Sequence, residues 1–241
     1  DRNNEMDMIA SYQLTQNAIL YSLRENESPL ARNYVDNLLK ERKKYSIFVA
    51  SISVVNRNFH VVSSSEEYEP GTVSAMKDVD PKYQTGEFII GDVYERITDD
   101  GRKNVVPAYT GVYYNNELIG YVMEELDTAY FDDLRLNMDT LADGTFYLLD
   151  GNGAIITAGD TKNKRSLKTF VSKSSDRNDF QKKWDAIDHE KNPSGYVRYR
   201  YHRQDYITYY SDVENTGWGI RVTENLSAQK QTGRTYGVLI A

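Results

Sequence analysis

The residues best suited to bind a small molecule are carboxylates and tyrosines that recur in strand-like runs in the first half of the chain. A carboxylate can pair with a ligand ammonium group, and a tyrosine face can add a cation–π interaction of about 0.5–2 kcal/mol. A recognition site needs a few fixed polar groups of this kind on an otherwise apolar, aromatic wall. The candidates are Tyr68, Tyr83, Asp92, Tyr94, Tyr109, Tyr113 and Glu125. The same spacing also fits a sheet whose alternate tyrosines pack and whose carboxylates face water.

Catalytic and metal-binding patterns are absent from the sequence. The chain has no cysteine, which excludes disulfide scaffolds, zinc ribbons and thiol catalysis. Its three histidines, His60, His189 and His202, are scattered, with no two at the spacing of a helical ligand pair. Neither a Gly-x-Ser-x-Gly elbow nor a Gly-Lys-Ser/Thr phosphate loop occurs. We therefore expect no enzyme, no metal and no cofactor, and a hydrolase with paired carboxylates is the weakest alternative.

Composition narrows the remaining classes of protein. The 241 residues suffice for one large domain or two ordinary ones, and the 39% hydrophobic content is enough for a packed core. The formal net charge of −7 argues against nucleic-acid binding, which needs clustered positive charge. The 20 tyrosines against 7 phenylalanines are typical of half-buried strands, in which the ring packs and the hydroxyl stays in water.

The elements that must position these residues begin with a helical pattern over residues 5–44. Apolar residues recur there at steps of three and four, from Ile9 to Leu23 and again from Leu30 to Leu39. Ser28 followed by Pro29 fits a helix start. We expect one long kinked helix or two helices in line, on the order of 60 Å long.

Strands and turns follow, and their layout occurs twice. A hairpin over residues 46–63 precedes a polar insert, strand-like runs at 87–94, 104–114 and 118–126, and a helix at 127–141. A second hairpin, turning at Asp150–Gly153, precedes an insert with a short helix near 180–187 and runs at 195–202, 206–213 and 219–223. This internal repeat predicts an α+β fold with two tandem five-stranded antiparallel sheets, flanked by helices.

The ends of the sequence suggest neighbouring membrane spans. No apolar run approaches the roughly 20 residues that a span needs. The chain nevertheless starts within a helical pattern and ends in the apolar stretch Tyr236–Ala241. We interpret the chain as lying between two spans, the second beginning at Gly237; a domain boundary inside a soluble protein is the alternative.

Three groups of residues resemble the double Cache family, the tandem PAS-like extracytoplasmic sensors of bacterial transmembrane receptors. The first group is Gly86–Tyr94 with Val105–Tyr109, which is similar to paired strands of the membrane-distal module. The second is Glu117–Val122, similar to its glycine-marked last strand. The third, Thr145–Gly153 with Thr216–Ile220, resembles the membrane-proximal module. The resemblance covers essentially the whole chain.

The resemblance implies four parts and a place for the ligand. Residues 1–45 are the N-terminal helix, 46–141 the ligand-binding distal module, 142–224 the proximal module, and 225–241 a closing helix that leads to a membrane span. The ligand pocket is expected on the concave face of the distal sheet, beneath residues 64–85. Amino-acid-binding members carry an Arg and a Trp-Tyr pair in this insert, which has neither Trp nor Arg between Glu66 and Gly86. Their Asp near the end of the last distal strand corresponds to Glu125 or Glu124.

The sequence therefore favours a sensor domain of a receptor in the cell membrane. The ligand is expected to be an amine, a nucleobase or another small metabolite, and the output module, outside this sequence, could be a histidine kinase, a chemotaxis signalling domain or a diguanylate cyclase. A homodimer through the N-terminal helix is expected. The alternative is a ligand-free structural, dimerisation or protein-interaction module of a membrane protein.

Overall fold

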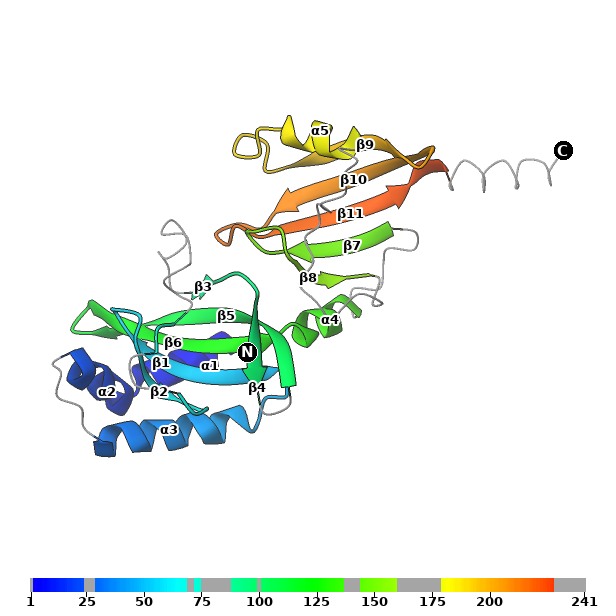
Figure 1. Cartoon of the computed structure of the whole chain (residues 1–241). Coiled ribbons are helices and arrows are strands. Elements are labelled where there is room, and N and C mark those ends of the chain that lie inside the picture. Colours follow the sequence, from blue (N-terminus) through cyan, green and yellow to red (C-terminus); the bar gives the residue numbers. More distant parts are fainter. Residues whose placement is uncertain are drawn as a thin grey trace. The chain divides into compact units, whose positions relative to one another are not determined.

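The computed structural model describes residues 2–23, 29–68, 72–74, 88–98, 101–136, 144–159 and 179–227. They divide into two compact units, Asp1–Tyr130 and Phe131–Ala241, each built on its own antiparallel sheet (Figure 1). The predicted α+β class with two antiparallel sheets is confirmed. Tyr83 and the closing helix beyond residue 227 lie outside the described residues.

The sheet of the first unit has six strands in the order β2-β1-β6-β5-β3, with β4 also paired to β5. The strands are β1 (Val49–Asn56), β2 (Val61–Ser64), β3 (Phe88–Ile90), β4 (Tyr94–Thr98), β5 (Gly101–Tyr114) and β6 (Glu117–Asp127). Five strands were predicted, because residues 87–94 read as one run. The structure instead has β3 within that run and β4 beginning at its last residue, and both pair with β5, on either side of Pro107. Pro107 has no N–H to donate, and only its carbonyl is used, by the Gly91 amide at 2.8 Å, so the ladder is interrupted there.

The N-terminal segment forms three short helices, and the predicted long helix was wrong. They are α1 (Arg2–Ser11), α2 (Gln13–Leu23) and α3 (Pro29–Lys43), the last beginning at the proline that the sequence indicated. Ile9, Ile19 and Leu39, one from each helix, are fully buried. All three helices contact the strands of the first unit. Because the segment is divided into three helices, each helix can turn its own apolar side toward the sheet. A single straight helix would extend beyond the sheet.

The two faces of the first sheet have different partners. Gly120 on β6 lies beneath Ile19 of α2, and Val122 and Val54 share that face by strand alternation. Figure 1 shows α1, α2 and α3 along this side of the sheet. The opposite face carries a separate apolar cluster: Val55, Ile89, Tyr109, Tyr121 and Met123.

The second unit has five strands in the order β8-β7-β11-β10-β9. They are β7 (Gly144–Leu149), β8 (Ile155–Ala158), β9 (Ser194–Tyr201), β10 (Gln204–Asp212) and β11 (Gly219–Asn225). Helix α4 (Ala129–Leu136) precedes them, and α5 (Asp179–Asp185) packs through Phe180 and Trp184 on Val197 and Tyr210. If β4 is set aside, the strand order equals that of the first unit, so the repeated layout of the sequence is a repeat of topology.

Candidate functional site

The candidate site lies on the face of the first sheet opposite α1–α3. The register of β1 and β6 places Ser51 opposite Glu125 and Ser53 opposite Met123. Residues directly opposite each other in an antiparallel pair point to the same face. Tyr109 on β5 pairs with Met123 and therefore joins this face as well.

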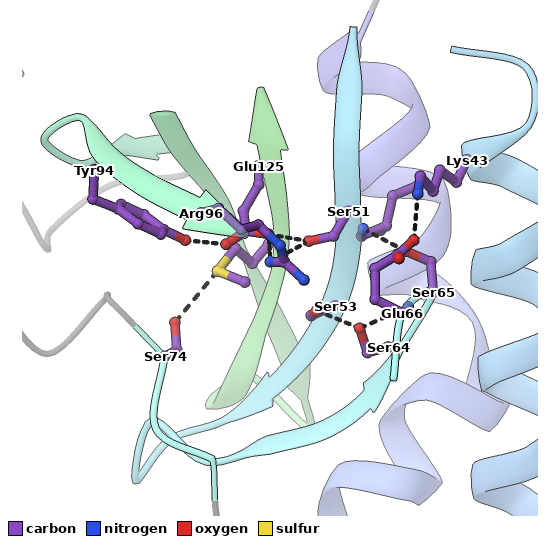
Figure 2. Close-up of polar contacts among 12 residues, drawn as sticks. Lys43, Ser51, Ser53, Ser64, Ser65, Glu66, Ser74, Tyr94, Arg96 and Glu125 are labelled. Atoms are coloured by element: carbon purple, nitrogen blue, oxygen red, sulfur yellow. Dashed lines mark hydrogen bonds and ion pairs between the residues drawn. The ribbon is translucent and has the colours of Figure 1, made fainter. Parts of the chain in front are cut away.

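Glu125 is the centre of the polar groups on this face. Its side chain is only 3% exposed, and it forms an ion pair with Arg96 of β4. The hydroxyls of Ser51 and Tyr94 also donate hydrogen bonds to its carboxylate (Figure 2). Arg96 in turn donates from Nη1 to Ser51 Oγ at 3.1 Å. Three strands, β1, β4 and β6, thus each contribute to one closed network around a buried carboxylate.

Burial controls the ionisation of the tyrosine in this network. Burial raises the pKa of the Tyr94 hydroxyl well above its usual range, and nearby Tyr109 raises it further, while the Arg96 guanidinium acts in the opposite direction. Tyr94 is therefore a neutral donor at physiological pH. The Arg96 guanidinium offsets the carboxylate, so this group of side chains can offer both an anionic and a cationic contact.

A second polar contact joins the beginning of the insert to the same face. Ser74 Oγ lies 3.3 Å from the hydroxyl of Tyr109. It also lies 3.4 Å from Met123 Sδ, and Figure 2 draws this second contact as a dashed line from Ser74 to the sulfur atom. Ser74 is held in place because its amide donates to the carbonyl of Phe59 at 2.8 Å. Residues 72–74 therefore pair back on the first hairpin and bring Ser74, one residue of the insert, against this face.

Hydroxyl groups continue from the site along the first hairpin. Ser53 Oγ donates to Ser64 Oγ at 3.0 Å, and the Ile52 amide donates to Ser65 Oγ at 2.9 Å. Lys43, in the last turn of α3, forms an ion pair with Glu66 just beyond β2. Figure 2 shows this series of side chains leading from Glu125 to the end of α3.

The structure separates the candidate residues into those on this face and those elsewhere. Tyr94, Tyr109 and Glu125 lie on it. Tyr68 instead donates to the carbonyl of Val62 at 2.5 Å, and the guanidinium of Arg32 lies 4.8 Å from its ring centroid. Tyr113 is 48% exposed near the far end of β5. Asp92 is half-buried in the Gly91–Val93 link between β3 and β4.

Sequence reasoning missed Arg96, Ser51 and Ser74. Arg96 follows Tyr94 by two residues and therefore shares its face, which is a signal that strand alternation could have given. Ser51 opposes Glu125 only through the pairing of β1 with β6, which the sequence does not specify. Glu124, the alternative to Glu125, pairs with Ile52 and points to the helix side of the sheet.

Two further properties can be stated for the part of the chain that the structure describes. Within it, no three His, Cys, Asp or Glu side chains gather closely enough to hold a metal ion. Nor does any helix there have the length and apolar character needed to cross a membrane.

Two antiparallel sheets of the same strand order, each with an insert after its first hairpin and the first carrying a buried polar network, define a tandem PAS-like protein. The chain belongs to the Cache domain family, whose model matches residues 2–228. The predicted resemblance is confirmed, and Cache domains are sensor domains rather than catalytic ones.

Solved structures share this fold at low sequence identity. The ligand-binding domain of the Campylobacter jejuni chemoreceptor Tlp3 in complex with 4-methylisoleucine is 15% identical, with a TM-score of 0.53 over 93% of this chain and 83% of that one. The sensor domain of the V. cholerae histidine kinase DctB is 12% identical, with a TM-score of 0.54 over 91% and 86%. None of the curated proteins matches the sequence.

Proposed function

We propose that this chain is the extracytoplasmic ligand-sensing domain of a bacterial signal-transduction receptor and binds a small solute on the candidate face of its first unit. The network of Glu125, Arg96, Tyr94 and Ser51 carries the proposal, because it places both charges and two hydroxyls on that face. The structural neighbours, sensor domains of chemoreceptors and histidine kinases, support the same role.

The network also constrains the ligand. Glu125 is already paired, so a simple amine has to displace Arg96 from the carboxylate before it can bind there. A nucleobase or another neutral metabolite can instead hydrogen-bond to the network without separating the two charges. A ligand that carries both charges can exchange partners with both side chains at once, and the 4-methylisoleucine complex of the chemoreceptor Tlp3 supports keeping this class.

Signalling requires that the ligand distinguish two arrangements of the domain. A ligand with equal affinity for both would shift no population, however tightly it bound. Tyr94 and Arg96 belong to β4, whereas Ser51 and Glu125 belong to β1 and β6. Ligand binding that favours one spacing between β4 and the other two strands supplies the required difference.

A thermal-shift screen against amines, amino acids, nucleobases, carboxylates and sugars tests the proposal. A ligand at about one hundred times its dissociation constant stabilises the folded state by about 2.7 kcal/mol, which raises the melting midpoint by several degrees. The shift should disappear in Tyr94→Phe, which removes a hydroxyl donor of the network, and remain in Tyr113→Phe, which removes the same atom from an exposed tyrosine. Retention in both variants would place the ligand elsewhere.

The alternative is a ligand-free structural or interaction module. It is favoured by one observation: the groups of the network satisfy one another. A screen without any stabilising compound, combined with wild-type signalling by the Tyr94→Phe receptor, would support this alternative.

A homodimer through the N-terminal helices and attachment to the membrane belong to the same proposal. Leu30, 86% exposed, and Tyr34 lie one turn apart on α3 and are available for a second copy. Sedimentation equilibrium should show a dimer that Leu30→Glu with Tyr34→Glu converts to a monomer. A monomeric wild-type chain at high concentration would contradict the dimer without affecting the ligand site.

A further inference from the structure

The hairpin between β9 and β10 carries a cluster of basic and aromatic side chains at its tip. The cluster, here called the β9–β10 tip, comprises Arg200, Tyr201, His202 and Arg203, all of which are exposed. The Arg200 side chain is 70% exposed, and the rings of Tyr201 and His202 lie 4.1 Å apart. Core packing therefore does not account for these residues, and their charge is opposite to the net charge of −7 of the whole chain.

The tip lies at the end of the second sheet from which the chain continues toward its C-terminus. Asn225, the last residue of β11, donates to Gln204 Oε1 at 2.9 Å. The amide of Asp205 donates to Ser227 Oγ at 2.8 Å. Figure 1 shows the start of β10 beside the end of β11. Whatever follows Ser227 in the chain therefore begins next to this tip.

We propose that the β9–β10 tip docks on the anionic phospholipid headgroups of the membrane in which the receptor is anchored. The inference rests on the proposed function, because a receptor anchored beyond β11 holds this tip close to a bilayer. The contact orients the second unit on the membrane surface, next to the point where the signal leaves the domain.

The residue types fit this partner. Arginine guanidinium groups bind phosphate oxygens in a bidentate way, and tyrosine is enriched at the headgroup level of membranes. Each basic residue near an anionic leaflet favours the docked state about fivefold. Arg198 lies two residues before Arg200 and shares its side of β9, so it extends the basic surface. Asp205, 4.0 Å from Arg200, offsets part of this charge.

The acidic character of the rest of the chain favours one orientation of the second unit on the membrane, with the tip toward the lipid. An anionic surface repels a body of net negative charge and attracts only its basic tip. A soluble anionic polymer could bind the same side chains. The position of the tip beside the end of β11 favours the bilayer, because the tether keeps that surface at a high local concentration.

The test measures how close the tip end of the sheet lies to a vesicle surface. A C-terminal polyhistidine tag anchors the chain to nickel-chelating lipid, in vesicles of phosphatidylcholine with or without phosphatidylglycerol. A fluorophore on Gly159→Cys reports energy transfer to acceptor lipids. The label is unique because the chain has no cysteine, and a Cβ at Gly159 meets its nearest atom at an ordinary 3.5 Å.

Transfer should be stronger on the vesicles that contain phosphatidylglycerol. Arg200→Gln with Arg203→Asn should lower the ratio of docked to undocked chains about thirtyfold. Asparagine suits position 203, whose φ is 64°. Lys40→Gln with Lys44→Gln removes the same charge from exposed positions of the first unit and should leave the ratio unchanged.

Three results would overturn the proposal. Equal transfer on both kinds of vesicle would exclude anionic headgroups, and equal losses in both double variants would show an effect of net charge alone. Tighter binding of the untethered chain to soluble polyglutamate, without any vesicle difference, would assign the tip to an anionic polymer. The ligand screen uses no lipid, so the failure of this test and the failure of solute binding are distinguishable.

Discussion

The guanidinium of Arg96 and the carboxylate of Glu125 form an ion pair on the face of the first sheet opposite the helices. The two residues come from β4 and β6, which are both hydrogen-bonded to β5 and not to each other. The pair therefore joins two strands across the one that separates them. Its partners Ser51 and Tyr94 extend the connection to β1 and strengthen it on the β4 side.

Arg96→Met should destabilise the protein, because Glu125 would remain buried with two hydroxyl donors but no cation. Removal of one partner from a buried ion pair costs about 3–5 kcal/mol. Because two hydroxyls still donate to Glu125, we expect a loss of unfolding free energy of about 3 kcal/mol, at the lower end of this range. Urea unfolding measures it. Arg102→Met, which breaks the exposed pair with Glu95, is the matched control and should cost less than about 1 kcal/mol. If Arg96→Met and Arg102→Met lowered the unfolding free energy equally, the Glu125 network would be as solvated as the exposed pair.

Stability should fall at alkaline pH because burial raises the pKa values of Tyr94, Tyr121 and Tyr199. In the unfolded chain these hydroxyls ionise at about pH 10. Above that pH the folded state binds more protons than the unfolded state, so the free energy of unfolding decreases as the pH rises. Each tyrosine contributes a slope of at most about 1.4 kcal/mol per pH unit.

Tyr94→Phe isolates one of these contributions. The variant loses a hydrogen bond to Glu125 at every pH, but its unfolding free energy should decline less steeply than that of the wild type above about pH 10. Parallel declines of the two proteins in urea titrations would mean that Tyr94 ionises as freely in the folded state as in the unfolded state.

The sequence predicted those parts of the fold that depend on local signals. Asn115–Asn116, with φ values of 52° and 64°, forms the tight turn that joins β5 to β6, and Pro29 begins α3. These features are set within a few residues of chain, which is why pattern and composition reveal them.

The remaining features depend on pairing between distant segments. Helical periodicity was correct for most of the described residues between 5 and 43, but no local signal fixed the break near Tyr12, because the sheet against which each helix packs decides it. The partnership of Ser51 with Glu125 joins residues 74 positions apart through the register of β1 and β6. Likewise, β3 and β4 are separate strands because Pro107 interrupts their pairing with β5, a partner that the pattern of residues 87–94 does not specify.

Gly120→Ala tests the register that builds the site. A Cβ at Gly120 would lie 2.2 Å from the carbonyl oxygen of Val55 and 3.1 Å from Ile19 Cδ1, so β1 or α2 would have to move. We expect a loss of about 3 kcal/mol in unfolding free energy. Gly159→Ala, with its nearest atom at 3.5 Å, should change stability by less than about 0.5 kcal/mol. A stable Gly120→Ala protein with unchanged ligand shifts would show that β1 and β6 tolerate separation.

Arg221→Lys tests the corresponding anchor of the second unit. The guanidinium of buried Arg221 lies 4.6 Å from the ring centroid of Trp184 and donates to the carbonyls of Ile220 at 2.8 Å and Ser211 at 3.3 Å. Lysine keeps the charge but cannot stack a planar group while donating in several fixed directions, so we expect a loss of about 2 kcal/mol.

Tryptophan fluorescence measures this loss directly, because both tryptophans of the chain, Trp184 and Trp218, belong to the second unit. Arg198→Lys is the control: Arg198 also lies over an aromatic ring, that of Tyr196 at 5.5 Å, but both residues are exposed. Solvent weakens a cation–π contact at such a position, so the control should lose less than about 1 kcal/mol. If the two substitutions cost the same, charge alone holds Arg221 in place, and the planar contact with Trp184 contributes nothing to the stability of the second unit.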